Sequence, residues 1–381
     1  MPAIHPRLRY VSPASEAWLK VAVDIPDELE PAELDKLLHR GWFRSGPLLY
    51  RAPLLPIDHR LRELVHLRLR LDGEVPKNRR RLLKRNRERF RTVFGPATLD
   101  NARRRLYRRM RPRFVGFVMR DLDGLGMTHP PFDTREVAVY DGDKLIAIGW
   151  FDLGRRAAAG LLGMHDPAYA KHGLGIYTML EEMAYARSHS ARWYYPGYVV
   201  PGVPAFDYKL GLGQAQFLRP DGRWRQLARA PSSTPIATRA HAEMEALEAA
   251  LARAGFATER RVYPSMWLGW VDDQPAPYLR GMWHLSIHAP GLPELVVEHL
   301  PTRQAFVAAT VRHETSINPF EDVLPASVMK DTYELRVLAY ETILARTRSM
   351  DQAVRGISRF VQQQRTAGQC SPPVPPAHPA S

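Results

Sequence analysis

A glycine turn at Gly173 and Gly175 comes directly before a predicted helix that runs to about Arg187. A turn of this kind presents free backbone N–H groups and the positive end of the helix dipole, which can hold an anion or the developing oxyanion of an acyl transfer. Glycines between a strand and a helix are also frequent simply because they let the backbone turn. The pattern therefore indicates anion binding or acyl transfer only if the neighbouring elements agree.

The segments on either side of the turn are predicted strands. Residues 136–140 and 144–152 are joined by Asp141-Gly142-Asp143, a strong hairpin signal, and an aromatic and β-branched run follows the helix at 192–200. The order strand, strand, helix, strand is similar to the core of GNAT acyltransferases. Such folds usually bind coenzyme A at a turn that begins with Gln or Arg, where this chain has Ala170. We therefore expect an α/β (α+β), GNAT-like acyltransferase fold with an incomplete acyl-CoA signature.

A series of ordered motifs surrounds this core. They are His165-Asp166-Pro167, Gly173-Leu174-Gly175-Ile176-Tyr177, Tyr195-Pro196-Gly197-Tyr198, Phe206-Asp207-Tyr208-Lys209 and Asp221-Gly222-Arg223-Trp224, with Gly41-Trp42-Phe43-Arg44-Ser45-Gly46, the pair Tyr50-Arg51 and an arginine-rich helix at 79–86 upstream. In order and spacing they resemble the aminoacyl-tRNA–protein transferases, which place arginine or leucine on protein N-termini. The resemblance covers residues 35–228, and several ordered motifs are far more specific than any one alone.

Three departures mark a diverged member of that family. The family's N-terminal cysteine cluster is absent from residues 52–59, so we predict neither a zinc nor an iron–sulfur site there. Ala205 replaces the first lysine of the Lys-Met-x-Tyr-Lys motif. Pro196 replaces a leucine and should bend or end its strand or place it at an edge of the sheet. His284 and His288 alternate along a predicted strand that would spread the two rings apart, so we expect no metal site anywhere.

The resemblance implies direct aminolysis, with aminoacyl-tRNA as co-substrate and no other cofactor. The ester is already activated, so an α-amine needs only to be positioned and deprotonated. We expect Tyr177, Tyr198 and Tyr208 to line the cleft and relay protons. Lys209 and Arg44 should attract an acidic acceptor residue or the RNA terminus. Asp166 could orient the amine or a water, although Asp before Pro is also an ordinary turn residue. The expected substrate-binding residues, of which Trp42 and Tyr198 suit a core equally well, are Trp42, Arg44, Ser45, Tyr50, His172, Gly173, Leu174, Gly175 and Tyr198.

The net charge of +14 favours an anionic partner, RNA first and a membrane surface second. Arginine clusters on predicted helices can also be no more than solvated faces. Two dense clusters in one domain favour phosphate contacts to the A-form acceptor stem of a tRNA, whose major groove is too narrow to read. The residues expected to contact tRNA are Arg79, Arg80, Arg81, Lys84, Arg85, Arg103, Arg104 and Arg105. We predict no DNA and no membrane partner.

Composition and linker signals suggest the domain organisation of the 381 residues. We expect a lead-in at 1–20, a basic N-terminal domain at 21–113, the GNAT-like transferase domain at 114–228, a linker at 229–239, an added α+β region of unknown role at 240–368 and a disordered tail at 369–381. Within the added region we predict helices at 240–254, 302–312 and 331–346 and strands at 266–271, 282–288 and 295–299. The single cysteine, Cys370, excludes an intrachain disulfide, and no secretory or transmembrane segment is predicted, so we expect a cytoplasmic protein.

Two other functions fit parts of the pattern. An acyl-CoA-dependent N-acyltransferase of GNAT type would need no RNA, but Ala170 and the basic clusters argue against it. A catalytically degenerate protein that binds tRNA or N-terminal peptides is the third possibility, because fold resemblance does not certify activity. The transferred amino acid (arginine or leucine first) and the acceptor, a protein N-terminus tagged for degradation by the N-end rule or a small amine, are open from sequence.

Overall fold

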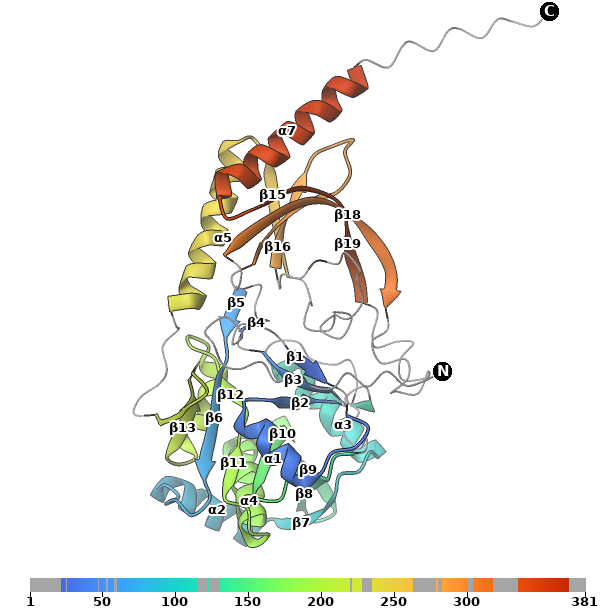
Figure 1. The fold of residues 1–381 in the computed structure, drawn as a ribbon. Helices are drawn as coiled ribbons and strands as arrows, with labels where there is room; N and C mark the ends of the chain where they lie inside the picture. Colours follow the sequence, from blue (N-terminus) through green and yellow to red (C-terminus); the bar gives the residue numbers. More distant parts are fainter. Residues whose placement is uncertain are drawn as a thin grey trace, which may run out of the picture. The chain divides into compact units, whose positions relative to one another are not determined.

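The computed structural model describes residues 22–24, 26–46, 48–52, 54–57, 60–114, 122–123, 131–219, 221–227, 235–262, 279, 283–300, 304–317 and 335–369. The described residues up to Ala237 form one compact unit, and nearly all those from Thr238 onward form a second (Figure 1). Both units mix helices and sheets, in agreement with the expected α+β class.

One large sheet organises the first unit, in the order β14-β13-β6-β11-β10-β9-β8-β7, with β12 paired to β6. Only β10 and β11 run parallel; every other neighbouring pair is antiparallel. The predicted hairpin is confirmed, since β8 and β9 close at Asp141 and Lys144. The strands are β6 (Val65–Arg70), β7 (Arg91–Pro96), β8 (Thr134–Asp141), β9 (Lys144–Leu153), β10 (Ala157–His165), β11 (Trp193–Tyr195), β12 (Tyr198–Val199), β13 (Ala215–Leu218) and β14 (Trp224–Gln226).

This sheet joins residues from both sides of position 113. Strands β6 and β7 precede that position, and both are hydrogen-bonded to strands that follow it. Small antiparallel sheets accompany it, one in the order β1-β3-β2 and one formed by β4 and β5. Their strands are β1 (Ala22–Asp24), β2 (Phe43–Ser45), β3 (Leu48–Arg51), β4 (Leu54–Ile57) and β5 (Arg60–Glu63).

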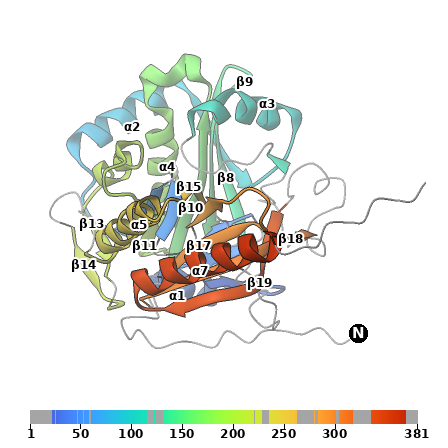
Figure 2. The same cartoon turned by 90° about the horizontal axis from the view of Figure 1, so that it is seen from above.

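Helices cover both faces of the large sheet (Figure 2). Side chains of α4 (Leu174–Ser188) pack on Ala147 of β9, whereas those of α3 (Asn101–Met110) pack on the next residue, Ile148. Successive residues of a strand point to opposite faces, so α3 and α4 lie on opposite sides of the sheet. The predicted helix after the glycine turn and both basic helices are confirmed. The other helical segments of the unit are α1 (Pro31–His39), α2 (Lys77–Arg89) and the short 3-10 helices η2 (Arg111–Arg113), η4 (Pro167–His172) and η5 (Pro204–Gly211).

The second unit contains a five-stranded antiparallel sheet in the order β15-β16-β17-β18-β19. The helix predicted at 240–254 is confirmed within α5 (Pro235–Arg253), whose start falls inside the expected linker, and the strands predicted at 282–288 and 295–299 are confirmed as β16 and β17. The strand predicted at 266–271 lies outside the described residues. The strands of this sheet are β15 (Ala257–Val262), β16 (Trp283–His288), β17 (Leu295–Leu300), β18 (Ala305–Ile317) and β19 (Leu335–Thr347).

The helices predicted at 302–312 and 331–346 were wrong, because the chain forms the long strands β18 and β19 from Ala305 and from Leu335 onward. Residues Phe306 to Val311 are all buried, so the strand has apolar residues on both faces. Such a continuous apolar run cannot be told from a buried helix by periodicity alone. Helix α7 (Met350–Gln369) follows β19 and reaches the first residue of the expected disordered tail. The rest of that tail, 370–381, lies outside the described residues.

No described helix is both long and apolar enough to cross a membrane. Among the residues that the structure describes, no group of three or more His, Cys, Asp or Glu side chains is placed to hold a metal ion. His284 and His288 both lie on β16, but His284 is buried and His288 is exposed.

Candidate functional site

The parallel strands β10 and β11 are paired only over three residues. Their register ends with Ala159 opposite Tyr195, and Pro196 follows directly. Proline has no N–H to donate and ends the strand, as the sequence predicted. Beyond this point β10 continues to His165, whereas the chain after β11 resumes as β12 against β6. Polar side chains collect on either side of Pro196. We call them the buried polar cluster: Tyr50, Glu182, Tyr194, Tyr198, Tyr208 and Lys209.

Glu182 and Tyr194 form the inner half of this cluster. The Tyr194 hydroxyl donates a 2.5 Å hydrogen bond to Oε2 of Glu182, and both residues are buried. Glycines on the sheet make room for them, because a Cβ at Gly149 would lie 2.2 Å from Glu182 Oε1 and one at Gly160 2.6 Å from the Tyr194 hydroxyl. Burial raises the pKa of Glu182 to about 8. The carboxyl is therefore largely protonated near neutral pH.

Lys209, at the end of η5, forms the outer half. Its Nζ donates a 2.7 Å hydrogen bond to the carbonyl oxygen of Tyr198. The same nitrogen lies 5.1, 5.2 and 5.5 Å from the ring centroids of Tyr198, Phe206 and Tyr208. No carboxylate of the described residues lies within ion-pair distance of it. Burial lowers the pKa of Lys209 to about 7, so near neutral pH a large part of this amine is uncharged and can accept a proton.

Tyrosines connect these groups with each other and with solvent. The Tyr50 and Tyr198 hydroxyls share a hydrogen bond, and burial raises the pKa of both side chains. Tyr208 is 45% exposed and is the most accessible member of the cluster. Desolvation, together with the nearby Glu182 charge, raises the pKa of Tyr208 to about 12. The structure thus brings together the sequence-predicted residues Tyr50, Tyr198, Tyr208 and Lys209.

Sequence reasoning missed Glu182 and Tyr194. The available signal was an acidic residue on an otherwise apolar turn of α4, in the segment Met179-Leu180-Glu181-Glu182-Met183. A carboxylate at such a position is costly unless it is paired or protonated. That cost marks Glu182 as unusual, but only the fold reveals which glycines accommodate it.

The glycine turn is a separate feature at the N-terminal end of α4. Gly173 has φ +63°, in the left-handed region, and no side chain caps the helix there. Helix α2 holds the turn, because Asn86 Nδ2 donates a 2.9 Å hydrogen bond to the carbonyl oxygen of His172. His172 and Leu174 are buried. A Cβ at Gly175 would lie 3.9 Å from His165 Nδ1.

Tyr177 and Asp166 lie beside this turn and make structural contacts. Tyr177 is fully buried in the core under α4, and its hydroxyl is 2.7 Å from Thr92 Oγ1. Asp166 Oδ2 is 2.9 Å from both Arg109 Nη1 and Lys144 Nζ. Asp166 also caps η4 through the Ala168 N–H. These contacts explain both residues without a catalytic role, and their expected roles remain predictions.

The upstream motif is part of the scaffold. Arg44 is buried, with Nη1 2.7 Å from Asp152 Oδ1 and 2.6 Å from Thr134 Oγ1. Trp42 packs on Leu37 and Leu49, and Ser45 is half-buried in β2. The Arg44 guanidinium therefore joins β2 to the large sheet, and its charge is already balanced by Asp152.

The two basic helices differ in how their charges are used. On α2, the cations Arg80, Arg81, Lys84 and Arg85 are exposed, and Arg79 donates to the carbonyl of Gly211. Neither Arg81 nor Arg85 has a carboxylate partner among the described residues. On α3, Arg103 is buried against Glu136 and Asp100, Arg104 is paired with Asp123, and Arg105 is exposed. The geometry favours phosphate contact for α2 and a structural ion pair for Arg103.

Comparison with known proteins finds a similarity over the part of the chain that holds this site. Residues 99–219 match the family model described as arginine-tRNA-protein transferase, C terminus. Over these residues the chain is similar to the aminoacyl-tRNA–protein transferase family. The matched span includes β8 to β13, α4 and every member of the buried polar cluster except Tyr50.

Individual proteins are similar to a larger part of the chain. An aspartate/glutamate leucyltransferase of Leptospira interrogans is 28% identical over 212 residues, which cover 52% of this chain and 80% of that protein. A protein of the same name from Vibrio cholerae is 28% identical over 221 residues, covering 54% and 88%. One from Acinetobacter baumannii is 25% identical over 222 residues, covering 57% and 80%. The relatives that match the chain are thus named as aminoacyltransferase enzymes.

Proposed function

We propose that the chain transfers an amino acid from charged tRNA to the α-amine of a protein N-terminus by direct aminolysis of the ester. The observation that carries this proposal is the buried Lys209 amine, which has no carboxylate partner among the described residues and a pKa lowered to about 7. An amine of this kind can take a proton from an α-ammonium group at neutral pH. It lies within the span that matches the transferase family.

The names of the relatives favour one donor and one class of acceptor. Proteins called aspartate/glutamate leucyltransferase match the chain, so we favour leucine over arginine as the transferred residue and an N-terminal Asp or Glu as the acceptor. Such tagging would direct the acceptor to degradation by the N-end rule. Strands β8 to β10, helix α4 and the parallel strand β11 support a GNAT-like core for this reaction.

The proposed reaction follows each proton from the acceptor amine to its final position. Neutral Lys209 Nζ takes a proton from the acceptor α-ammonium group, and the freed amine nitrogen attacks the ester carbonyl carbon. The bond from this carbon to the ribose oxygen then breaks, and the Lys209 ammonium gives its proton to that oxygen. The amine nitrogen loses its second proton to the neutral Lys209 amine, which releases it to solvent. The products are a new peptide bond and a tRNA with a free ribose hydroxyl. Tyr208, the exposed tyrosine of the cluster, would connect Lys209 with the reacting groups.

The glycine turn is a second proposed contact for the donor. Gly175 precedes Glu182 by seven residues of α4, or about 10 Å along the helix axis. The first amides of α4 would hold the ester oxyanion or a phosphate of the RNA. His172, Tyr177 and Asp166 would support this turn, and Trp42, Arg44 and Ser45 the sheet beside the cluster.

A transfer assay tests the function. The purified chain is incubated with tRNA charged with labelled leucine or arginine and with peptides that begin with Asp, Glu or Lys, with and without RNase. We expect RNase-sensitive labelling of the Asp and Glu peptides from leucyl-tRNA. Labelling from acetyl-CoA instead would favour the acyl-CoA-dependent acyltransferase. Salt-sensitive tRNA binding without any product would favour a binding protein that lacks catalysis.

A further inference from the structure

A basic surface of the first unit is built around Arg68 of β6. The Arg68 guanidinium is buried and lies over the rings of Trp193 and Trp224, 3.8 and 4.4 Å from their centroids. Its Nε donates a 2.8 Å hydrogen bond to Gln216 Oε1, and its Nη1 lies 2.9 Å from His39 Nδ1. Both tryptophans are half-buried, so part of each ring reaches the surface. Arg68 thus holds two large aromatic side chains in fixed positions at the surface.

Exposed arginines lie beside these rings. The Arg192 N–H donates a 2.7 Å hydrogen bond to the carbonyl oxygen of Arg156, and both side chains are exposed. Arg192 precedes Trp193 in the chain. Burial and, to a smaller extent, the charge of Arg192 lower the pKa of Arg68, which places the two guanidinium groups near each other. We call this region the tryptophan–arginine surface, and its members are Arg156, Arg192, Trp193 and Trp224.

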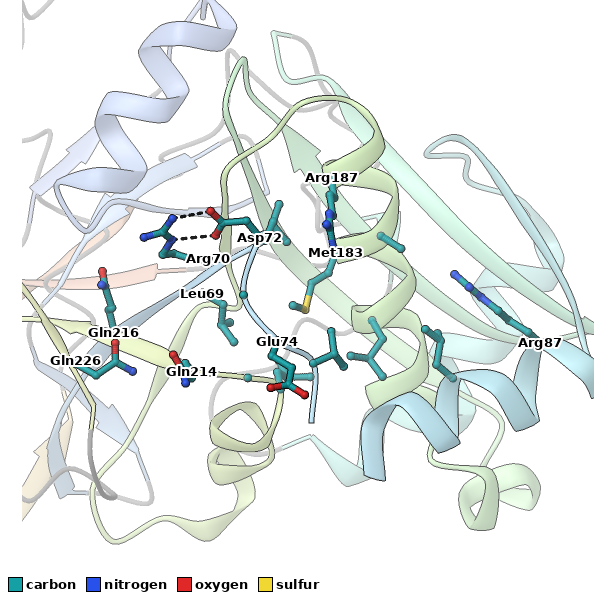
Figure 3. Close-up of a pocket in the computed structure, with 18 residues that line it drawn as sticks. Leu69, Arg70, Asp72, Glu74, Arg87, Met183, Arg187, Gln214, Gln216 and Gln226 are labelled. Atoms are coloured by element: carbon teal, nitrogen blue, oxygen red, sulfur yellow. Dashed lines mark hydrogen bonds and ion pairs between the residues drawn. The ribbon is translucent and has the colours of Figure 1, made fainter. Parts of the chain in front are cut away.

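The positive charge of this surface is not balanced within the described part of the fold. Neither the Arg156 nor the Arg192 side chain has an ion-pair partner among the described residues. Asp35 Oδ2 accepts a hydrogen bond from the main-chain N–H of Arg156 and not from its side chain. By contrast, Arg70 of β6 is paired with Asp72 through two hydrogen bonds (Figure 3). The two unpaired cations therefore favour an anionic partner.

The tryptophans favour a polypeptide over RNA as this partner. A base needs an open ring face on which to stack, but Arg68 already covers one face of each ring, and Trp224 also contacts Tyr195 and His39. Tryptophan and arginine are enriched among the residues that contribute most to binding at protein interfaces. Clusters of arginine recognise acidic segments of polypeptides. An acidic polypeptide segment thus matches both the rings and the charges.

The surface lies within reach of the proposed reaction site. Trp193 precedes Tyr198, whose carbonyl oxygen accepts the hydrogen bond from Lys209 Nζ, by five residues, or at most about 17 Å of extended strand. An extended peptide covers that distance with about five residues. We propose that the tryptophan–arginine surface binds acidic residues of the acceptor protein that follow its N-terminus by about five positions or more. This inference rests on the proposed function and adds a requirement on the acceptor that is separate from its first residue.

The test uses two acceptor peptides that differ only in their downstream residues. Both begin with Asp and carry a fluorophore at the C-terminus. A stretch that starts about five residues after the N-terminus is glutamate in one peptide and glutamine in the other. Binding is followed by fluorescence anisotropy without tRNA. We expect the unmodified chain to bind the glutamate peptide about 2 to 30 times more tightly at low salt, the range for two exposed ion pairs, and to lose most of this preference at high salt.

Variants of the two arginines separate charge from structure. Arg156→Gln/Arg192→Gln should remove the preference and leave binding of the glutamine peptide unchanged. Arg156→Glu/Arg192→Glu should instead prefer a third peptide with lysine in the same stretch, which a merely structural role would not produce. Arg355→Gln/Arg359→Gln, exposed on α7, changes the net charge equally and is the matched control. In the transfer assay, Arg156→Gln/Arg192→Gln should raise KM for the glutamate peptide by the same factor and leave kcat unchanged.

Each outcome supports or overturns the inference. Equal binding of the glutamate and glutamine peptides by the unmodified chain, or a preference that survives in Arg156→Gln/Arg192→Gln, overturns it even if leucine transfer is observed. An equal loss in the α7 control overturns it as well, because net charge alone would then explain the binding. Weaker tRNA binding by Arg156→Gln/Arg192→Gln, without any peptide preference in the unmodified chain, would assign the surface to RNA and overturn it. A clear peptide preference in a chain that transfers no amino acid would support the surface and contradict the proposed function.

Discussion

The Tyr194 hydroxyl donates its hydrogen bond to a Glu182 carboxyl that is itself enclosed by two strands at their glycines. A carboxylate in this position would lose nearly all its hydration, which costs several kcal/mol for a buried ion. Protonation avoids that cost, which explains why burial raises the pKa of Glu182 to about 8. The fold thus keeps a largely protonated acid within the buried polar cluster.

Replacement of Glu182 by Gln should change how stability depends on pH. A carboxyl whose pKa rises from 4.5 in the unfolded chain to about 8 in the folded chain binds more protons when folded. The stability that this carboxyl contributes is fully present below pH 4.5. It is lost as the pH rises to about 8, which lowers the free energy of unfolding by up to about 4–5 kcal/mol. Glu182→Gln cannot ionise, so its free energy of unfolding should exceed that of the unmodified chain increasingly towards pH 8.

Urea unfolding at several pH values between 4.5 and 8.5 measures this difference. Glu88→Gln, at an exposed position of α2, is the control and should follow the unmodified chain at every pH. A constant offset between Glu182→Gln and the unmodified chain across the whole range would contradict a raised pKa.

Lys209→Met should abolish transfer. It should also change the pH dependence of stability in the direction opposite to that of Glu182→Gln. Loss of a general base typically costs a factor of about 10² to 10⁴ in rate. The pKa of the buried amine falls from 10.5 to about 7 on folding, so the unfolded chain binds more protons between these values. Stability of the unmodified chain should therefore increase from pH 7 to pH 10.5 through this group, and Lys209→Met should remove that increase.

The activity profile gives a second readout for Lys209. In the unmodified chain, kcat/KM for the acceptor peptide should rise with pH through about 7, as Lys209 loses its proton. Lys209→Arg should be as inactive as Lys209→Met, because a guanidinium stays protonated. Lys36→Met, at an exposed position of α1, should leave the profile unchanged. Normal transfer by Lys209→Arg would exclude Lys209 as the base.

Local signals in the sequence predicted the local elements well. The Asp141-Gly142-Asp143 turn and the Gly173 turn specify the β8–β9 hairpin and the start of α4 because turn chemistry depends on a few adjacent residues. The role of Glu182 could not be found in this way. It depends on Gly149 and Gly160, which other strands bring under the helix.

The sequence also could not show which basic residues are paired within the fold. Arg44 and Arg103 both stand in motifs that suggest substrate or RNA contact, but each is buried on a carboxylate from a distant strand, Asp152 and Glu136 respectively. The position of a cation in a motif does not reveal a carboxylate partner that lies on a distant strand. The exposed cations of α2 have few such partners, which makes that helix the better expectation for RNA.

Arg44→Ala should destabilise the first unit and leave Asp152 as a buried charge without its main partner. Removing one member of a buried ion pair typically costs about 3–5 kcal/mol. We expect a loss of that order in the free energy of unfolding at neutral pH. The double variant Arg44→Met/Asp152→Leu should recover much of it, since an apolar pair of similar size avoids the buried charge. Equal instability of both variants would mean that packing around Arg44, such as its contact with Phe132, matters more than the charge.

Neutralising Arg81 and Arg85 should weaken tRNA binding through the salt-dependent component alone. The slope of log K against log salt concentration should fall by about one for every phosphate that the protein no longer neutralises. The variant Arg81→Gln/Arg85→Gln is therefore expected to lower the slope by about two, without a change in thermal stability, because both side chains are exposed. Arg155→Gln/Arg223→Gln, also exposed, is the matched control with the same net charge. An equal effect of both double variants would assign the binding to net charge alone and not to α2.

Alanine at Gly173 should show how strongly α2 holds the glycine turn. Gly173 has φ +63°, and a Cβ there would lie 3.0 Å from Leu82 Cδ1 of α2. Gly142, with φ +59° and open space around its Cβ position, isolates the backbone cost. We expect Gly142→Ala to lose about 1–2 kcal/mol in the free energy of unfolding, the cost of a left-handed L-residue, and Gly173→Ala to lose more because Leu82 must also move. If the two variants lose the same amount, α2 yields readily at this point, and the turn does not depend on tight packing against Leu82.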